Sequence, residues 1–268
     1  MTNLLIFAGA GLFAGILAGF LGIGGGTVLV PLLLALGYDY TQSVATSNLS
    51  IVITAISGSL QNWRMGYINF KQVIGIGFPA LITAQVGAFL TAQIAASTLK
   101  IAFGLLLLLN VYLVGLRKRL KDKEALQSPS DSGVTANSLS SPSSELNLPL
   151  NPIVARIGTG SAAGLLAGLF GVGGGVILVP MQILLLGESL KTAIQTSLGI
   201  IVITSISATV GHAIEGNVLF TQGLLLGAGG FLGAQISTRF LPRLPDKVVS
   251  FAFRGLLVTL AIYVFWQA

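Results

Sequence analysis

Runs of apolar residues separated by short polar breaks follow one another along almost the whole chain. The pattern predicts ten helical segments, at roughly 3–21, 27–37, 43–61, 72–95, 99–116, 153–170, 176–187, 192–212, 219–238 and 247–266. Most of them reach the ~20 residues that a helix needs to cross ~30 Å of hydrocarbon. The runs 27–37 and 176–187 reach only about 11–12 residues, which favours half-helices or strongly tilted ones. The pattern therefore predicts an all-α integral membrane protein.

Composition supports lipid as the surrounding solvent. Hydrophobic residues make up 53% of the chain and charged residues only 8%, whereas a soluble domain carries about 25% charged residues. The net charge of +6 comes from basic residues at the ends of apolar runs, so it indicates membrane orientation and not nucleic-acid binding. With no cysteine and one histidine, we expect no metal site and no cofactor.

One stretch breaks the apolar pattern and divides the chain. Basic residues open it at 117–123, and Ser, Pro and Asn dominate the rest up to residue 151. Such a composition is typical of a disordered linker. The sequence therefore predicts a first membrane repeat at 1–116, a cytoplasmic linker at 117–151 and a second membrane repeat at 152–268.

The two halves resemble each other. GILAGFLGIGGGTVLVP from Gly15 matches GLLAGLFGVGGGVILVP from Gly164 at an offset of 149, and IVIT from Ile51 matches IVIT from Ile201 at 150. A third match, GAFLTAQI with GGFLGAQI, has an offset of 142 and would pair Gln93 with Gln235. Because each half has five segments, an odd number, the halves are expected to be inverted repeats in the membrane.

Basic residues predict the orientation. With the linker in the cytoplasm, 13 of the 14 Lys and Arg residues fall on the cytoplasmic side and only Lys100 falls outside. This predicts a multi-pass protein of the plasma membrane with both termini outside. The segments on either side of each glycine cluster count as two spans or as one re-entrant hairpin, and the charges fit both.

The strongest local motif is a doubled G-x-G-G-G-x-x-x-x-P. Its residues are Gly22, Gly24, Gly25, Gly26 and Pro31 in the first half, and Gly171, Gly173, Gly174, Gly175 and Pro180 in the second. Glycine runs disfavour helix, and broken helix in lipid must be buried in protein or line a cavity. Amide groups at the start of each following half-helix would then bind an anion. The alternative is that the glycines only permit close helix crossing.

A second motif begins the third segment of each half. Thr46, Ser47 and Asn48 stand there in the first half, and Thr196 and Ser197 in the second, where Leu198 replaces the asparagine. Hydroxyl groups can donate to an oxyanion and cost less to bury than a cation. We predict that these residues line the site, although Ser and Thr also bond back to their own helix.

The doubled glycine–proline motif, the ten-segment inverted layout and the Thr-Ser pairs resemble the TauE/SafE family of sulfite-exporter-like permeases, over almost the whole chain except the linker. The resemblance implies a permease for a small anion, such as sulfite, sulfoacetate or another organic acid, working by alternating access. A proton or sodium ion would be the coupling ion, and the lipid bilayer the other partner. An anion channel and an intramembrane enzyme are the alternatives, but the apolar segments offer no Asp or Glu as a catalytic acid or base.

Other polar residues have plainer interpretations. Gln85, Gln93, Gln195 and Gln235 are expected to form interhelical hydrogen bonds. His212 and Glu215 are expected to be a solvated pair at a loop edge. Arg254 is expected to extend its charge to the cytoplasmic surface, the alternative being attraction of an anion into an inner vestibule.

Overall fold

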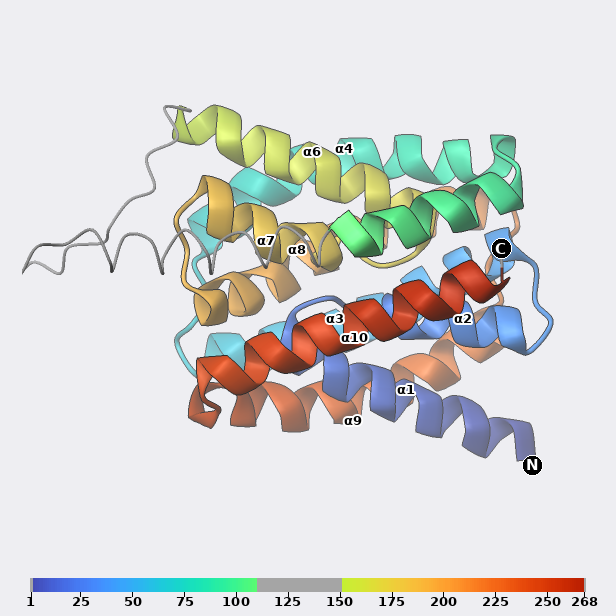
Figure 1. The fold of residues 1–268 in the computed structure, drawn as a ribbon, viewed down its shortest axis with the longest axis horizontal. Helices are drawn as coiled ribbons and strands as arrows, with labels where there is room; N and C mark the ends of the chain where they lie inside the picture. Colours follow the sequence, from blue (N-terminus) through green and yellow to red (C-terminus); the bar gives the residue numbers. More distant parts are fainter. Residues whose placement is uncertain (1, 110–150, 268) are drawn as a thin grey trace, which may run out of the picture.

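The computed structural model describes residues 2–109 and 151–267, and within these ranges it contains helices but no strand. The first half has α1 (Thr2–Leu21), α2 (Gly26–Ala35), α3 (Tyr40–Arg64), α4 (Phe70–Gln93) and a helix without a label at Ala96–Leu109. The second half has α6 (Pro152–Phe170), α7 (Gly175–Leu185), α8 (Leu190–Ile214), α9 (Phe220–Phe240), the 3₁₀ turn η1 (Leu241–Arg243) and α10 (Asp246–Gln267). Each predicted segment overlaps one of these helices (Figure 1), so the all-helical prediction is confirmed.

The helices fall into two length classes. Within the described residues, α1, α3, α4, α6, α8 and α9 are long and apolar enough to cross a bilayer. The helices α2 and α7 have only 10 and 11 residues, which corresponds to about 15–17 Å, or half the hydrocarbon thickness. The two short segments expected from the sequence are therefore present.

Of the predicted linker 117–151, only Asn151 lies within the described residues. Its side chain accepts a hydrogen bond of 3.0 Å from the amide of Ile153 and so caps the start of α6. The remainder of the linker, including the basic run 117–123, lies outside the described residues.

The two halves interlock through paired helices. α1 packs along α9 and α6 packs along α4, so the first helix of each half pairs with the fourth helix of the other half. At these crossings the backbones touch: a Cβ on Gly15 would overlap Gly230, and a Cβ on Gly164 would overlap Ala80. Small residues allow such close crossings in lipid. The same crossing is thus built twice from opposite halves.

Polar contacts between helices fix the register of the two halves. Gln85 Nε2 donates to Ser207 O over 2.7 Å, and Gln235 Nε2 donates to Ser57 O over 3.2 Å. Gln85 and Gln235 are 150 residues apart, and so are Ser57 and Ser207. The second contact therefore repeats the first with the halves exchanged. The expected offset of 142, which matched Gln93 to Gln235, is therefore wrong. Helices built from few residue types share short strings by chance, and here such a string gave the wrong alignment.

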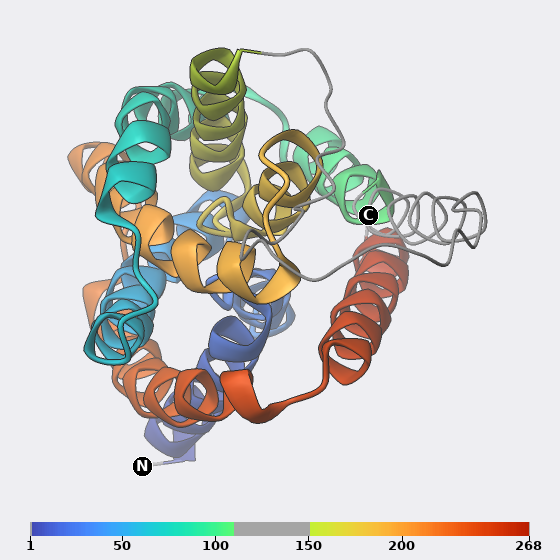
Figure 2. The same cartoon turned by 90° about the vertical axis from the view of Figure 1, so that its left-hand side faces the viewer.

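The helices run between two ends of the molecule, and α1 begins at the same end at which α10 finishes (Figure 1). We call this the terminal end, and the opposite one the basic end. The basic side holds eight of the nine Lys and Arg residues in the described ranges: Arg64, Lys71, Arg156, Lys191, Arg239, Arg243, Lys247 and, two turns into α10, Arg254. The ninth, Lys100, lies at the terminal end. Figure 2 looks from the basic end and shows α10 on the side of the molecule opposite α4.

Candidate functional site

Two short non-helical segments interrupt the apolar helices at the glycine motifs. We call residues 22–25, between α1 and α2, the first break, and residues 171–174, between α6 and α7, the second break. Directly before each short helix, the φ angle is 84° at Gly25 and 77° at Gly174, a left-handed conformation that residues with a Cβ rarely adopt. Positive φ also occurs at Gly22, Gly24, Gly171 and Gly173. The glycine runs therefore produce the same backbone turn in both halves.

The two breaks lie against each other. A Cβ on Gly26 would overlap the carbonyl oxygen of Gly171, and a Cβ on Gly175 would overlap the carbonyl oxygen of Gly22. All four residues are buried. The start of each short helix is thus in backbone contact with the break of the opposite half.

Each short helix begins with amide groups that have no acceptor within their own helix. The first hydrogen bonds inside α2 and α7 run from Val28 to Gly25 O over 3.1 Å and from Ile177 to Gly174 O over 3.2 Å. The amides before Val28 and Ile177 have no acceptor within their own helix, as at any helix N-terminus. Such termini carry partial positive charge and favour anions. Two of them meet where the breaks touch.

Each predicted serine is hydrogen-bonded to the break of the opposite half. Ser47 Oγ donates to Gly171 O over 2.8 Å, and Ser197 Oγ lies 2.8 Å from both Gly22 O and Ile194 O. Both hydroxyls are fully buried. A hydroxyl has one proton to donate, so in this conformation it is directed to a carbonyl of the protein. The serines therefore reach the predicted place, but they bind backbone there.

The neighbouring polar residues are placed differently. Thr46 Oγ1 accepts a hydrogen bond of 3.1 Å from the amide of Leu219 at the start of α9. Asn48 Nδ2 donates to Ala167 O over 3.3 Å, near the end of α6. Within the described residues, Thr196 Oγ1 is buried without a partner. Asn48 thus lies beside the second break, whereas Thr46 faces a loop away from it.

The predicted prolines lie inside the short helices. Pro31 and Pro180 are both buried, five residues after the first residue of α2 and α7. Because proline has no amide proton, the carbonyls of Thr27 and Val176 lack their usual helical donor. The prolines thus affect the body of each short helix and do not take part in the contact between the breaks.

Two isoleucines fill the space between the breaks. A Cβ on Gly24 would lie 3.2 Å from Ile51 Cγ2 and 3.3 Å from Ile201 Cγ2, and a Cβ on Gly173 would lie 3.0 and 2.9 Å from the same atoms. Both isoleucine side chains are fully buried. In this conformation isoleucine side chains therefore occupy the space between the breaks, where the sequence predicted a polar-lined cavity. Ser205 Oγ, 3.3 Å from the same Cβ position on Gly173, is a polar atom beside them.

Comparison with known proteins agrees with this architecture. The profile of the family described as Sulfite exporter TauE/SafE matches residues 7–264. The chain belongs to the TauE/SafE family. A probable membrane transporter protein of Bacillus subtilis, YunE, is 26% identical over 273 residues, which cover 99% of this chain and 98% of the relative. The probable membrane transporter protein MJ0441 of Methanocaldococcus jannaschii is 28% identical over 213 residues, 75% of this chain and 69% of the relative. No solved structure gives a significant match.

These names, with the apolar helices, identify a multi-pass membrane transporter.

In this TauE/SafE chain the two breaks are held unequally. Thr204 Oγ1 lies 2.9 Å from Gly173 O, in the second break, whereas the matching Thr54 Oγ1 donates to Ser50 O in its own helix. The second break is therefore tied to α8 of its own half as well as to α3.

The end of α6, just before the second break, is also capped by side chains. Gly168 O accepts from Thr91 Oγ1 over 3.1 Å and lies 3.0 Å from His212 Nε2, while Leu169 O accepts from Tyr40 OH over 3.5 Å. Carbonyls at a helix C-terminus lack intrahelical donors, so these side chains satisfy them. The second break consequently begins from a fixed helix end.

The position of His212 corrects an expectation. The side chain is fully buried, whereas Glu215 is exposed and accepts a hydrogen bond of 3.2 Å from Asn217 Nδ2. The two do not form a solvated pair, because α6 ends beside His212 and covers it. The interhelical role expected for glutamines does hold for Gln85 and Gln235.

Sequence reasoning missed the residues that cover and fix the breaks. Ile51 and Thr204 stand in the repeated I-V-I-T string, which marks the duplication but gives no sign of a site. Tyr40 and Thr91 cap the end of α6 from helices distant in sequence. The only available signal was the repetition of the string at nearly the same distance from both glycine motifs, 25 residues after Gly26 and 26 after Gly175.

Proposed function

We propose that this TauE/SafE chain is a carrier for small anions, either sulfur oxyanions such as sulfite or organic acids such as sulfoacetate. Its site lies between the two breaks, and the two halves act as inverted repeats that alternate access to it. The observation that carries the proposal is the contact between the N-terminal end of each short helix and the opposite break. The description of the family as sulfite exporters supports the substrate class.

Neutral groups would bind the anion. The N-terminal amides of α2 and α7 approach one another, and dipoles of short helices favour negative charge without a formal cation. The Lys and Arg residues of the described ranges lie at helix ends or, for Arg254, two turns from one. Binding by amide groups alone is moderate in strength, which suits a carrier that must also release its substrate.

Ser47 and Ser197 would switch between the breaks and the substrate. Each hydroxyl now donates to a carbonyl of the opposite break, and a hydroxyl has only one proton. If a break moves away from the serine that binds it, that hydroxyl can donate its hydrogen bond to an anion instead. The isoleucines Ile51 and Ile201 would separate at the same time, which opens a space for the anion between the breaks.

The unequal attachment of the breaks supports a cycle with two conformations. Thr204 and the caps on α6 hold the second break, and Thr54 makes no matching bond to the first. In an inverted repeat, exchanging the conformations of the two halves produces the opposite state. We propose that the first break moves first, because fewer side chains hold it.

Orientation follows from charge. Eight of the nine described Lys and Arg residues lie toward the basic end, and basic residues favour the cytoplasmic side. We therefore propose that the basic end and the linker face the cytoplasm and that both termini lie outside. A proton or sodium ion remains the proposed coupling ion.

The test is uptake into proteoliposomes that contain the purified protein. A panel of labelled sulfite, sulfoacetate, sulfate and acetate is supplied outside, with and without unlabelled anion inside. A carrier gives saturable uptake that internal substrate accelerates, and imposed proton or sodium gradients identify the coupling ion. Absence of uptake for every anion would contradict the proposal, and uptake without saturation or exchange would favour the channel alternative.

A further inference from the structure

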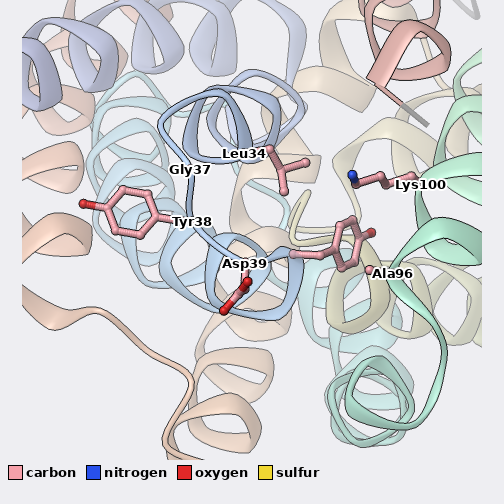
Figure 3. A pocket seen from close by; sticks show the side chains of 7 residues that line it. Leu34, Gly37, Tyr38, Asp39, Ala96 and Lys100 are labelled. Atoms are coloured by element: carbon pink, nitrogen blue, oxygen red, sulfur yellow. The ribbon is translucent and has the colours of Figure 1, made fainter.

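A pocket at the terminal end leads toward the second break. It has a volume of about 440 Å³ and is lined by Leu34, Gly37, Tyr38, Asp39, Tyr40, Ala96 and Lys100. These residues come from the end of α2, the turn into α3 and the first turns of the helix Ala96–Leu109. Figure 3 shows the ammonium group of Lys100 directed across the pocket toward Leu34.

Lys100 contributes a positive charge to the wall of this pocket. Lys100 is the one Lys or Arg that the described residues place at the terminal end. Asp39 is exposed at the rim, and its carboxylate points away from Lys100 in Figure 3. A cation against low-dielectric walls attracts anions more strongly than one in open water.

The inner wall of the pocket adjoins the second break. Tyr40, which is 4% exposed, donates from its hydroxyl to Leu169 O, two residues before Gly171. Ser47, which binds Gly171, lies seven residues further along α3, or about 10 Å along the helix. The pocket and the proposed central site therefore share one face of α3.

A pair of stacked aromatic rings joins the helix of Lys100 to the second break. Phe103, one turn after Lys100, stacks on Phe170 with ring centroids 5.5 Å apart. Both rings are almost fully buried, with 1% and 3% of their surface exposed. Phe170 directly precedes the second break, so movement of the break displaces one ring of the stack.

We propose that this pocket is the outer capture site for the transported anion, that Lys100 supplies its charge, and that the Phe103–Phe170 stack is the barrier between the pocket and the second break. This inference rests on the proposed function. The pocket is larger than a bare oxyanion needs, and Leu34 and Ala96 provide apolar wall. The preferred ligand is therefore an organic anion, a small sulfonate or carboxylate with a carbon skeleton, over sulfite itself.

The chain has no cysteine, so Lys100→Cys allows the charge to be removed and restored chemically. In proteoliposomes, the half-saturating concentration of external sulfoacetate should rise about ten-fold or more in Lys100→Cys, the scale of one charge-assisted hydrogen bond. Aminoethyl methanethiosulfonate should restore it, and sulfonatoethyl methanethiosulfonate should raise it further. Maximal uptake should stay unchanged.

Matched variants sharpen the result. Lys100→Arg should behave as the parent protein, and Asp39→Asn should lower the half-saturating concentration because it removes a rim carboxylate. Lys71→Cys, at the basic end, should respond to neither reagent. An unchanged half-saturating concentration in Lys100→Cys, or equal recovery with both reagents, would overturn the inference while leaving transport itself intact.

A binding measurement separates this inference from the proposed function. Sulfoacetate should slow the reaction of Lys100→Cys with the sulfonate reagent, whether or not the protein transports. Sulfate, a bare oxyanion that does not react with the thiol reagent, should protect only at higher concentration than sulfoacetate. If phosphatidylglycerol vesicles give the protection and sulfoacetate in phosphatidylcholine vesicles does not, the pocket binds a lipid headgroup, and the capture site is refuted.

Discussion

The hydroxyl of Ser47 donates to the carbonyl oxygen of Gly171 over 2.8 Å and so joins two residues 124 positions apart. The same contact, with the halves exchanged, joins Ser197 to Gly22 at 2.8 Å. Each half therefore restrains the glycine break of the other. Each break is thus hydrogen-bonded to a long helix of the opposite half, the second break to α3 and the first break to α8.

The serine contacts should contribute to stability. Ser47→Ala and Ser197→Ala should each lower the free energy of unfolding by about 0.6–1 kcal/mol, the usual scale of one hydrogen bond within a membrane protein. Unfolding in mixed detergent micelles measures this change. Ser43→Ala is the matched control on α3, because Ser43 Oγ is buried without a partner in the described residues. Equal losses for Ser43→Ala and Ser47→Ala would show that the hydroxyl contact to the break contributes nothing.

The register of the halves predicts which cysteine pairs form disulfides. Gln85 contacts Ser207, and Gln235 contacts Ser57. Double cysteine variants at 85 with 207 and at 235 with 57 should therefore cross-link on mild oxidation, as measured by mass spectrometry of the linked peptides. The pair at 93 with 207 is the control and should stay reduced. Cross-linking of that control would instead support the alignment at an offset of 142, which pairs Gln93 with Gln235.

The proposed orientation predicts one-sided labelling. A cysteine placed anywhere in 125–145 should react with an impermeant thiol reagent only after the membrane is opened. Lys100→Cys should react from outside intact cells, because Lys100 lies in the first turns of the helix Ala96–Leu109, at the terminal end. Labelling from the outside at 125–145 would reverse the orientation and would make the pocket at Lys100 cytoplasmic.

Several features of the fold could be predicted from the sequence because they follow from local chemistry. Runs of three glycines strongly disfavour helix, so the breaks and the short helices after them were predictable. The partner that a polar side chain contacts could not be predicted. His212 stands three residues before Glu215 and resembles a loop-edge residue until α6 covers it. Such contacts arise from the interlocking of the halves, which no local pattern reveals.

The candidate site was predictable to the same extent. The position of Ser47 and Ser197 near the glycines follows from the duplication, since both motifs recur at nearly constant spacing. That their hydroxyls bind break carbonyls, and that Ile51 and Ile201 fill the centre, depends on the packing of helices from both halves. An apolar side chain carries no chemical signal of such a role.

The central claim is that the two breaks form the anion site, and substitution of the glycine before each short helix tests it. Alanine at Gly25 or Gly174 must adopt a positive φ, at a cost of about 1–2 kcal/mol, and would press on the backbone of the preceding helix at Ala14 or Ala163. Gly9→Ala and Gly158→Ala are the controls, because nothing lies within 4 Å of a Cβ at either position.

The decisive measurement is the half-saturating concentration of the transported anion in proteoliposomes with equal amounts of inserted protein. The account predicts a rise of about ten-fold or more for Gly25→Ala and for Gly174→Ala, the equivalent of losing about 1.4 kcal/mol of binding, and no change for the two controls. Wild-type half-saturation in both break variants would contradict it and would reduce the glycines to a packing device.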